Sequence, residues 1–301
     1  MRIVCAVDGS EHARWGIQTL EALAEREPEQ VVLLHVIDKP TIQTKRSKVL
    51  PTEQQALDAM EKAGELLLRE AEHSVRVALG QAATDPRTRL HRVMAYGPPA
   101  STIAKQAKRW NADLILIGSR GLSDIKGFLL GSISRQVAAM APCSVLVVKQ
   151  PCRRLQRVTL AVDDSKQSRA AAVFLRSRIL PESATVTVFS SAESPVTDLA
   201  ARYLSESQLA ALTKPVMARA TSLVTSLRDA FIKAGYAATT KVQMDHVIDA
   251  IVKYVEADQS ELLVVGSRTL TKTERIHLGS ASESLLRHAP CSILIVRGTR
   301  A

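Results

Sequence analysis

Aromatic residues are scarce in this chain of 301 residues, and several features that would point to other classes of protein are missing. Phe, Trp and Tyr make up only 3% of the sequence, so the core must be built from Ala, Val, Leu and Ile. No apolar run approaches the ~18 residues that a membrane span needs. The chain opens on the strand-like segment MRIVCAVD, with no signal segment before it. These absences favour a cytoplasmic protein of the α/β class with no membrane partner.

Cysteine is also rare, with four residues in the whole chain. Cys5, Cys143 and Cys291 lie in or just before apolar strand patterns, so we expect them to be buried, reduced thiols. Cys152 lies between the two halves of the chain and is expected to be the most exposed of the four. It has no CxxC partner and no neighbouring Cys/His cluster, so the sequence predicts no metal site.

A net charge of +10 raises the question of a polyanionic partner. Residues 1–150 hold 20 Lys and Arg against 16 Asp and Glu, and the remainder hold 20 against 14, so neither half carries a dense basic block. The longest basic cluster is Lys45, Arg46 and Lys48, in a segment that is typical of a solvated loop. The charge distribution therefore predicts no nucleic-acid partner.

The sequence repeats itself once. ADLILIGS at 112–119 matches SELLVVGS at 260–267, and APCSVLVV from Ala141 matches APCSILIV from Ala289 at the same shift of 148 residues. AVDGS at 6–10 matches AVDDS at 161–165 at a shift of 155. The repeat predicts two tandem domains, 1–150 and 156–301, joined by a linker from Lys149 to about Leu155.

Within each repeat, short apolar runs alternate with amphipathic segments, which is typical of βαβ units and a parallel sheet. The strands expected in the first repeat are Ile3–Asp8, Val31–Ile37, Leu90–Ala95, Leu114–Gly118 and Val145–Val148. The first and fourth are continuously apolar and should be central, whereas the third contains His91 and Arg92 and should be an edge. The fold class is therefore α/β, with two doubly wound domains that each hold a five-stranded parallel sheet (order 3-2-1-4-5) with helices on both faces.

A glycine-rich loop follows the fourth strand. Gly118 and Gly121 would let backbone N–H groups approach an anion, and Gly131-Ser132 would open a helix whose N-terminus favours phosphate. In a doubly wound sheet, ligands bind beyond the carboxyl ends of the strands where the strand order reverses, which here are the ends that carry Asp8 and Gly118. Asp8 could instead be only the N-cap of the first helix, a role that Ser10 can also fill. Arg120 or Lys126 could add positive charge.

The strand end AVDGS, the run LLHVID at 33–38, the segment YGPPASTIAKQAKRWNADLILIGSRG at 96–121 and the loop G-x2-G-x9-G-S resemble the universal stress protein family. The resemblance covers nearly the whole chain as a tandem of two such domains. It implies that the loop glycines and the following serine bind ATP phosphates and ribose, that the first-strand aspartate contacts the nucleoside, and that the second-strand valine contacts adenine through its backbone. These roles fall on Gly118, Gly121, Gly131, Ser132, Asp8 and Val36, while Gly9, Gly97, Ser119 and Arg120 are expected to line the same crevice. His35 is interpreted as a packed histidine, and no catalytic residue is predicted.

The second repeat departs from this pattern. It keeps Asp163, Gly266 and Gly279-Ser280, but Thr269 replaces the second loop glycine, where a β-branched residue at φ > 0 would cost about 1–3 kcal/mol. Asp164 and Asp245 replace two further glycines and would repel phosphate. We expect the second repeat to bind nucleotide weakly or not at all.

The resemblance favours a cytoplasmic ATP-binding regulatory protein of the stress response, in which ATP, with or without Mg²⁺, acts as a conformational switch. Two alternatives stay open: a slow ATPase or phosphotransferase, and a nucleotide-independent interaction or chaperone-like protein. The loop lacks the Gly-Lys-Ser/Thr of a Walker A motif, so any hydrolysis should be slow. Because family members dimerise through their last strand, the resemblance also implies an intrachain pseudo-dimer of the two repeats, with a homodimer as a further possibility.

Overall fold

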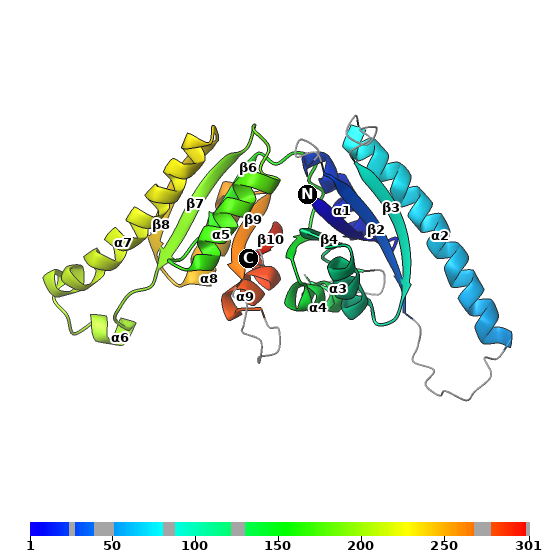
Figure 1. Cartoon of the computed structure of the whole chain (residues 1–301). Coiled ribbons are helices and arrows are strands. Elements are labelled where there is room, and N and C mark those ends of the chain that lie inside the picture. The colour runs from blue at the N-terminus through cyan, green and yellow to red at the C-terminus, as the bar shows by residue number, and fades with distance from the viewer. Residues whose placement is uncertain (24–27, 39–50, 81–87, 122–129, 268–277, 299–301) are drawn as a thin grey trace. The chain divides into compact units, whose positions relative to one another are not determined.

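The computed structural model describes residues 1–23, 28–38, 51–80, 88–121, 130–267 and 278–298 (Figure 1). The chain divides into two compact units, the first of which holds Met1–Arg154, and Leu155 opens the second. Among the helices in these ranges, none is long and apolar enough to cross a membrane.

The first unit is a parallel sheet in the order β3-β2-β1-β4-β5. Its strands are β1 (Arg2–Ala6), β2 (Gln30–Ile37), β3 (Arg89–Tyr96), β4 (Leu114–Gly118) and β5 (Ser144–Val148). Its helices are α1 (Glu11–Leu23), α2 (Pro51–Leu79), α3 (Pro99–Arg109) and α4 (Ser132–Met140). All five expected strands are present, and their bounds differ from the prediction by at most two residues.

Burial follows the predicted order of strands. Every residue of β4 is buried, as expected for a central parallel strand that helices cover on both faces. By contrast, β3 is mostly half-buried or exposed and pairs only with β2 among the described strands. In this unit α1 and α2 cover one face of the sheet and α3 and α4 cover the other. The doubly wound prediction is confirmed.

The second unit repeats this arrangement, with the order β8-β7-β6-β9-β10. Its strands are β6 (Arg157–Ala161), β7 (Thr185–Ala192), β8 (Ala237–Met244), β9 (Leu262–Ser267) and β10 (Ser292–Arg297). Its helical segments are α5 (Lys166–Phe174), the π-helical η3 (Leu175–Ile179), α6 (Asp198–Ala201), α7 (Glu206–Lys233), α8 (Val247–Asp258) and α9 (Ser280–His288). The element α5 thus corresponds to α1, α7 to α2, α8 to α3 and α9 to α4.

Serine side chains begin the equivalent first helices of both units. The Ala13 N–H donates to Ser10 Oγ at 3.1 Å, and the Ser168 N–H donates to Ser165 Oγ at 3.2 Å. Each serine satisfies one of the N–H groups that a helix start leaves without an intrahelical partner. Ser10 is therefore the N-cap of α1, a role that the sequence left open between Ser10 and Asp8.

The cysteines correct one expectation. All four are reduced thiols, and Cys5 and Cys291 are buried as predicted. Cys152 is only 5% exposed, with its Sγ donating to the Arg154 carbonyl oxygen at 3.3 Å, so the expectation that it would be the most exposed is wrong. Cys143, expected to be buried, is half-buried instead. Position between two repeats does not by itself predict exposure, because a connecting segment can pack its apolar side chains.

Candidate functional site

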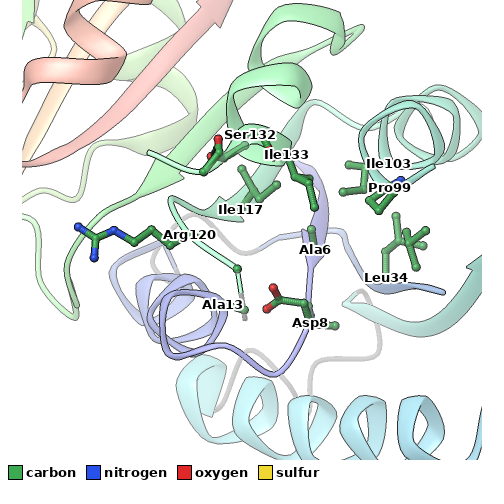
Figure 2. Close-up of a pocket in the computed structure, with 16 residues that line it drawn as sticks. Ala6, Asp8, Ala13, Leu34, Pro99, Ile103, Ile117, Arg120, Ser132 and Ile133 are labelled. Carbon is green, nitrogen blue, oxygen red and sulfur yellow. Dashed lines mark hydrogen bonds between the residues drawn. The ribbon is translucent and has the colours of Figure 1, made fainter. Parts of the chain in front are cut away.

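A cavity of about 160 Å³ lies at the carboxyl ends of β1 and β4 in the first unit (Figure 2). The turn after β1 contributes Asp8, the loop after β4 contributes Arg120 and Gly121, and the start of α4 contributes Gly131 and Ser132. This is the position where the strand order of a doubly wound sheet reverses and where such folds bind ligands.

Seven of the ten predicted site residues line this cavity, and three do not. The seven are Asp8, Val36, Gly118, Arg120, Gly121, Gly131 and Ser132. Gly9 and Gly97 are not part of the lining, and they hold positive φ angles of 84° and 123°, which favour glycine. Ser119 is only 1% exposed, and its carbonyl oxygen accepts a hydrogen bond from the Gly131 N–H. Lys126 and Thr269 lie outside the described residues.

Asp8 faces the cavity because another residue caps α1. Ser10 accepts the Ala13 N–H, while its own hydroxyl donates to the Arg120 carbonyl oxygen at 3.3 Å and so links the β1 turn to the loop after β4. Asp8 Oδ1 accepts the Ser10 N–H at 2.9 Å, which orients the carboxylate. The alternative interpretation of Asp8 as only a helix cap is therefore excluded.

The start of α4 has the properties of an anion site. Gly131 is its N-cap, with extended φ and ψ of −74° and 155° and no side-chain cap. The next N–H groups therefore have no intrahelical partner, and the helix dipole makes this end partly positive. These backbone angles suit any residue, so backbone strain does not explain a glycine at position 131.

Hydrogen bonds to Ser119, the residue that follows β4, hold the start of α4 in place. The Ser119 carbonyl oxygen accepts the Gly131 N–H at 2.7 Å and the Ser134 hydroxyl at 2.9 Å. The Ser134 hydroxyl also lies 2.9 Å from the Gly131 carbonyl oxygen. Sequence patterns did not single out Ser134, since a serine in the first turn of a helix is common.

Close packing against α1 requires a glycine at position 118. A Cβ there would lie 2.6 Å from the carbonyl carbon of His12 and 2.8 Å from the backbone nitrogen of Ala13, both in α1. The same holds in the second unit, where a Cβ on Gly266 would lie 2.6 Å from the carbonyl carbon of Gln167. Helix packing is thus a reason for this glycine that the sequence did not reveal, and its presence in the second repeat is by itself no sign of a phosphate site. The predicted role of Gly118 beside an anion stays a prediction.

One side of the cavity is an apolar slot that sequence reasoning missed. Leu34 of β2 lies across from Pro99 and Ile103 of α3 (Figure 2). Val36, two residues further along the same face of β2, also lines the cavity. Because side chains alternate along a strand, the sequence could have shown that Leu34 lies on the same face of β2 as Val36. The opposition of α3, however, arises only when the chain folds.

His35 points to the other face of β2. Its Nδ1 donates to the Val7 carbonyl oxygen at 2.9 Å, and α2 passes so close that a Cβ on Gly64 would lie 2.8 Å from the imidazole Cδ2. In the second unit the Ser190 hydroxyl donates to the Val162 carbonyl oxygen at 3.0 Å, in the same place. The interpretation of His35 as a packed histidine is confirmed.

Arg120 lines the cavity with its inner part. Figure 2 shows the guanidinium group extending away from Asp8 and the apolar slot. Its Nε is buried and has no hydrogen-bond partner among the described residues. Asp8 and Arg120 are the charged side chains in this lining. Across the described ranges, no group of three or more His, Cys, Asp or Glu side chains is placed to hold a metal ion.

The two extra aspartates of the second unit are paired with cations. Asp164 Oδ1 lies 2.7 Å from Arg169 Nη2, and Asp245 Oδ2 lies 3.8 Å from Lys253 Nζ. Both pairs are largely exposed, where solvent screens them further. Both carboxylates therefore have a cationic partner, and their repulsion of phosphate stays a prediction.

The family model of the universal stress proteins matches residues 1–149 and again 154–297. A Staphylococcus aureus (strain USA300) protein named as a universal stress protein is 34% identical over 148 residues, which are 49% of this chain and 82% of that protein.

Solved structures match over the whole chain. A universal stress protein from Archaeoglobus fulgidus has a TM-score of 0.68 at 19% identity and covers 99% of this chain and 98% of its own. One from Pseudomonas aeruginosa UCBPP-PA14 has a TM-score of 0.60 at 15% identity, with coverage of 98% and 92%. Both share the fold of this chain. With two consecutive matches to the family model, this chain belongs to the universal stress protein family as a tandem of two such domains.

Proposed function

We propose that the first unit binds ATP in the cavity described above, and that this binding switches the conformation of a cytoplasmic regulatory protein of the stress response. The observation that carries the proposal is the meeting of three different surfaces in one cavity. These are the apolar slot of β2 and α3, the Asp8 carboxylate, and the uncapped start of α4.

Each surface suits one part of a nucleotide. The slot between Val36 and Ile103 suits a flat base, because apolar side chains on both sides exclude water from its faces. Asp8 can accept hydrogen bonds from ribose hydroxyls. The N–H groups at the start of α4 and the Ser132 hydroxyl can donate to phosphate oxygens. Among the described lining residues, Asp8 is the one that carries a carboxylate. Mg²⁺, where present, would therefore be held mainly by the phosphates.

Binding would have a conformational effect because the three surfaces belong to different elements. A bound nucleotide would join the turn after β1, the start of α4 and the first turn of α3. It stabilises whichever arrangement brings these elements together, in proportion to its difference in affinity for the two states. This supports a switch that changes the choice of protein partner.

An ATPase or phosphotransferase is the second candidate. The residues that line the cavity indicate that any turnover of ATP is slow. Phosphoryl transfer needs a residue that orients the nucleophile and cations on the transferred group. Among the described lining residues, Asp8 is the acid–base group and Arg120 is the cation, and the Arg120 guanidinium group extends away from Asp8. A nucleotide-independent interaction protein is the third candidate.

We also propose that the two units pair within one chain through their last strands. Taken separately, β5 and β10 each end the strand order of their own unit, and both consist largely of Val, Leu and Ile. Apolar edge strands of this kind favour a partner, because uncovered ones promote aggregation. Analytical ultracentrifugation that finds only monomers would fit pairing within the chain, and dimers would point to a homodimer.

Two measurements test the binding proposal. Mass spectrometry of small molecules released from the denatured protein should find an adenine nucleotide. Isothermal titration of nucleotide-free protein with ATP should give one site per chain. No heat and no co-purified nucleotide would favour the nucleotide-independent protein, and steady release of phosphate in a turnover assay would favour the ATPase.

A further inference from the structure

The second unit carries Phe189 at the position of Leu34. In the first unit Ala6 of β1 pairs with Leu34 of β2, and the Val7 N–H donates to the Leu34 carbonyl oxygen at 2.9 Å. In the second unit Ala161 pairs with Phe189, and the Val162 N–H donates to the Phe189 carbonyl oxygen at 2.8 Å. The two side chains therefore leave the sheet at equivalent points and on the same face.

The Phe189 ring fills space that a smaller side chain would leave open. It is fully buried, and its centroid lies 5.0 Å from the ring of Tyr254 in α8, the helix that corresponds to α3. The Tyr254 hydroxyl lies 3.2 Å from Thr187 Oγ1 and 3.4 Å from Asp258 Oδ1, so the ring pair is anchored to β7 and α8. In the first unit the Leu34 side chain, at the position equivalent to Phe189, lines the apolar slot.

The aspartate of the second unit is also engaged by its own unit. The hydroxyls of Ser168 and Ser165 each donate to Asp163 Oδ1 at 2.5 Å. In the first unit Ala13 replaces Ser168, and the Ser10 hydroxyl donates to the Arg120 carbonyl oxygen and not to Asp8. Asp163 thus accepts, from serine hydroxyls, the kind of hydrogen bond that a ribose hydroxyl would supply.

We propose that the second unit is closed to nucleosides by its own side chains, with Phe189 in place of the base and the Ser168 hydroxyl in place of a ribose hydroxyl. The proposal rests on the proposed function, because it takes the first cavity as the nucleoside site. Leu34 and Ala13 are then the residues that keep the first unit open. As a consequence, nucleotide stabilises only the first unit, and the second keeps one conformation whether ATP is present or absent.

Transfer of the two blocking residues into the first unit tests the proposal in the full chain. Adenosine is the probe, because it has no phosphates and does not depend on the glycine loop. We expect Leu34→Phe to weaken adenosine binding by about tenfold or more, and Ala13→Ser to weaken it by a smaller factor. Leu66→Phe makes the same exchange at an exposed position of α2 outside the cavity lining, so it is the matched control and should bind as the parent chain does. Normal binding by a folded Leu34→Phe chain would overturn the proposal.

Should Leu34→Phe fail to fold, the reverse substitutions in the second unit still test the proposal. The Phe189→Leu, Ser168→Ala chain should bind two adenosine molecules where the parent chain binds one, a gain that a structural role for these residues cannot produce. A stoichiometry that stays at one in the folded double variant would overturn the proposal. If the parent chain binds neither adenosine nor ATP, the proposed function itself has failed, and that outcome is separate from both arms.

Discussion

Ser168 donates a hydrogen bond of 2.5 Å to the carboxylate of Asp163, and the first unit has no such bond because Ala13 stands where Ser168 would be. The two repeats therefore keep the same aspartate at the end of the first strand and use it differently. In the first unit the carboxylate faces a cavity, and in the second it is held by two serine hydroxyls. Retention of a motif residue is thus no evidence that its binding role is retained.

Gly131→Val should abolish ATP binding and leave the fold intact. The Gly131 φ and ψ of −74° and 155° suit any residue, so the valine adds no strain but fills the space in front of α4 where phosphates would bind. Isothermal titration measures the loss, and circular dichroism checks the fold. Gly279→Val is the matched control in the second unit, where an added Cβ meets nothing within 4 Å and ATP binding should not change. Equal ATP affinity of the two variants would contradict the assignment of α4 as the phosphate end.

Gly121→Val should also remove ATP binding, since Gly121 lines the same cavity at the loop after β4. A valine side chain there would occupy volume that the phosphates need. ATP affinity is measured by titration, and thermal unfolding checks that the variant is as stable as the parent chain. A folded Gly121→Val chain with unchanged affinity would remove this loop from the site.

Gly118→Ala should destabilise the protein even without ligand, because the new Cβ would lie 2.6 Å from the backbone of α1. Overfilled packing of this kind costs about 1–3 kcal/mol, which chemical denaturation of the nucleotide-free chain can measure. Gly16→Ala is the control within α1, because its Cβ would meet Leu116 at an ordinary 3.8 Å and alanine favours the helix. If Gly118→Ala is as stable as the parent chain, close approach of α1 does not explain this glycine.

Thr269→Gly combined with Asp164→Gly and Asp245→Gly should fail to create a second ATP site. Arg169 and Lys253 already balance the two carboxylates, and Phe189 remains in the core of the unit in this variant. The titration is done in a chain that also carries Gly131→Val, so that any heat comes from the second unit. Tight binding by this variant would show that the loop and the two aspartates, and not Phe189, had closed the second unit.

Cys5 should resist alkylation in the folded protein. Burial raises the pKa of the Cys5 thiol to about 12 from an ordinary value of 9.0. Near pH 8 this lowers the reactive thiolate population about a thousandfold, since each pKa unit is a factor of ten. Iodoacetamide labelling read by peptide mass spectrometry should modify the half-buried Cys143 first and Cys5 only after denaturation. Equal labelling rates of these two cysteines in the native protein would contradict the burial of Cys5.

Much of the fold could be read from the sequence because it depends on local patterns. Continuous apolar runs identified β1 and β4 as central strands, and the charged residues His91 and Arg92 identified β3 as an edge. The internal repeat predicted two units, and the loop after β4 directed attention to Gly121 and Gly131. Strand alternation and helix starts are set by neighbours in the chain, so they are visible before folding.

Contacts between distant segments decided the rest. Only the folded chain shows that α1 approaches Gly118, that α3 lies opposite Leu34, and that Ser10 rather than Asp8 caps α1. The ion pair of Asp164 with Arg169 and the burial of Cys152 also went unforeseen. The sequence by itself determined which residues could meet at the carboxyl ends of the strands. Tertiary packing alone decided that Leu34 lines a cavity and that Phe189 is buried against Tyr254, because the size of a cavity depends on side chains contributed by segments far apart in the chain.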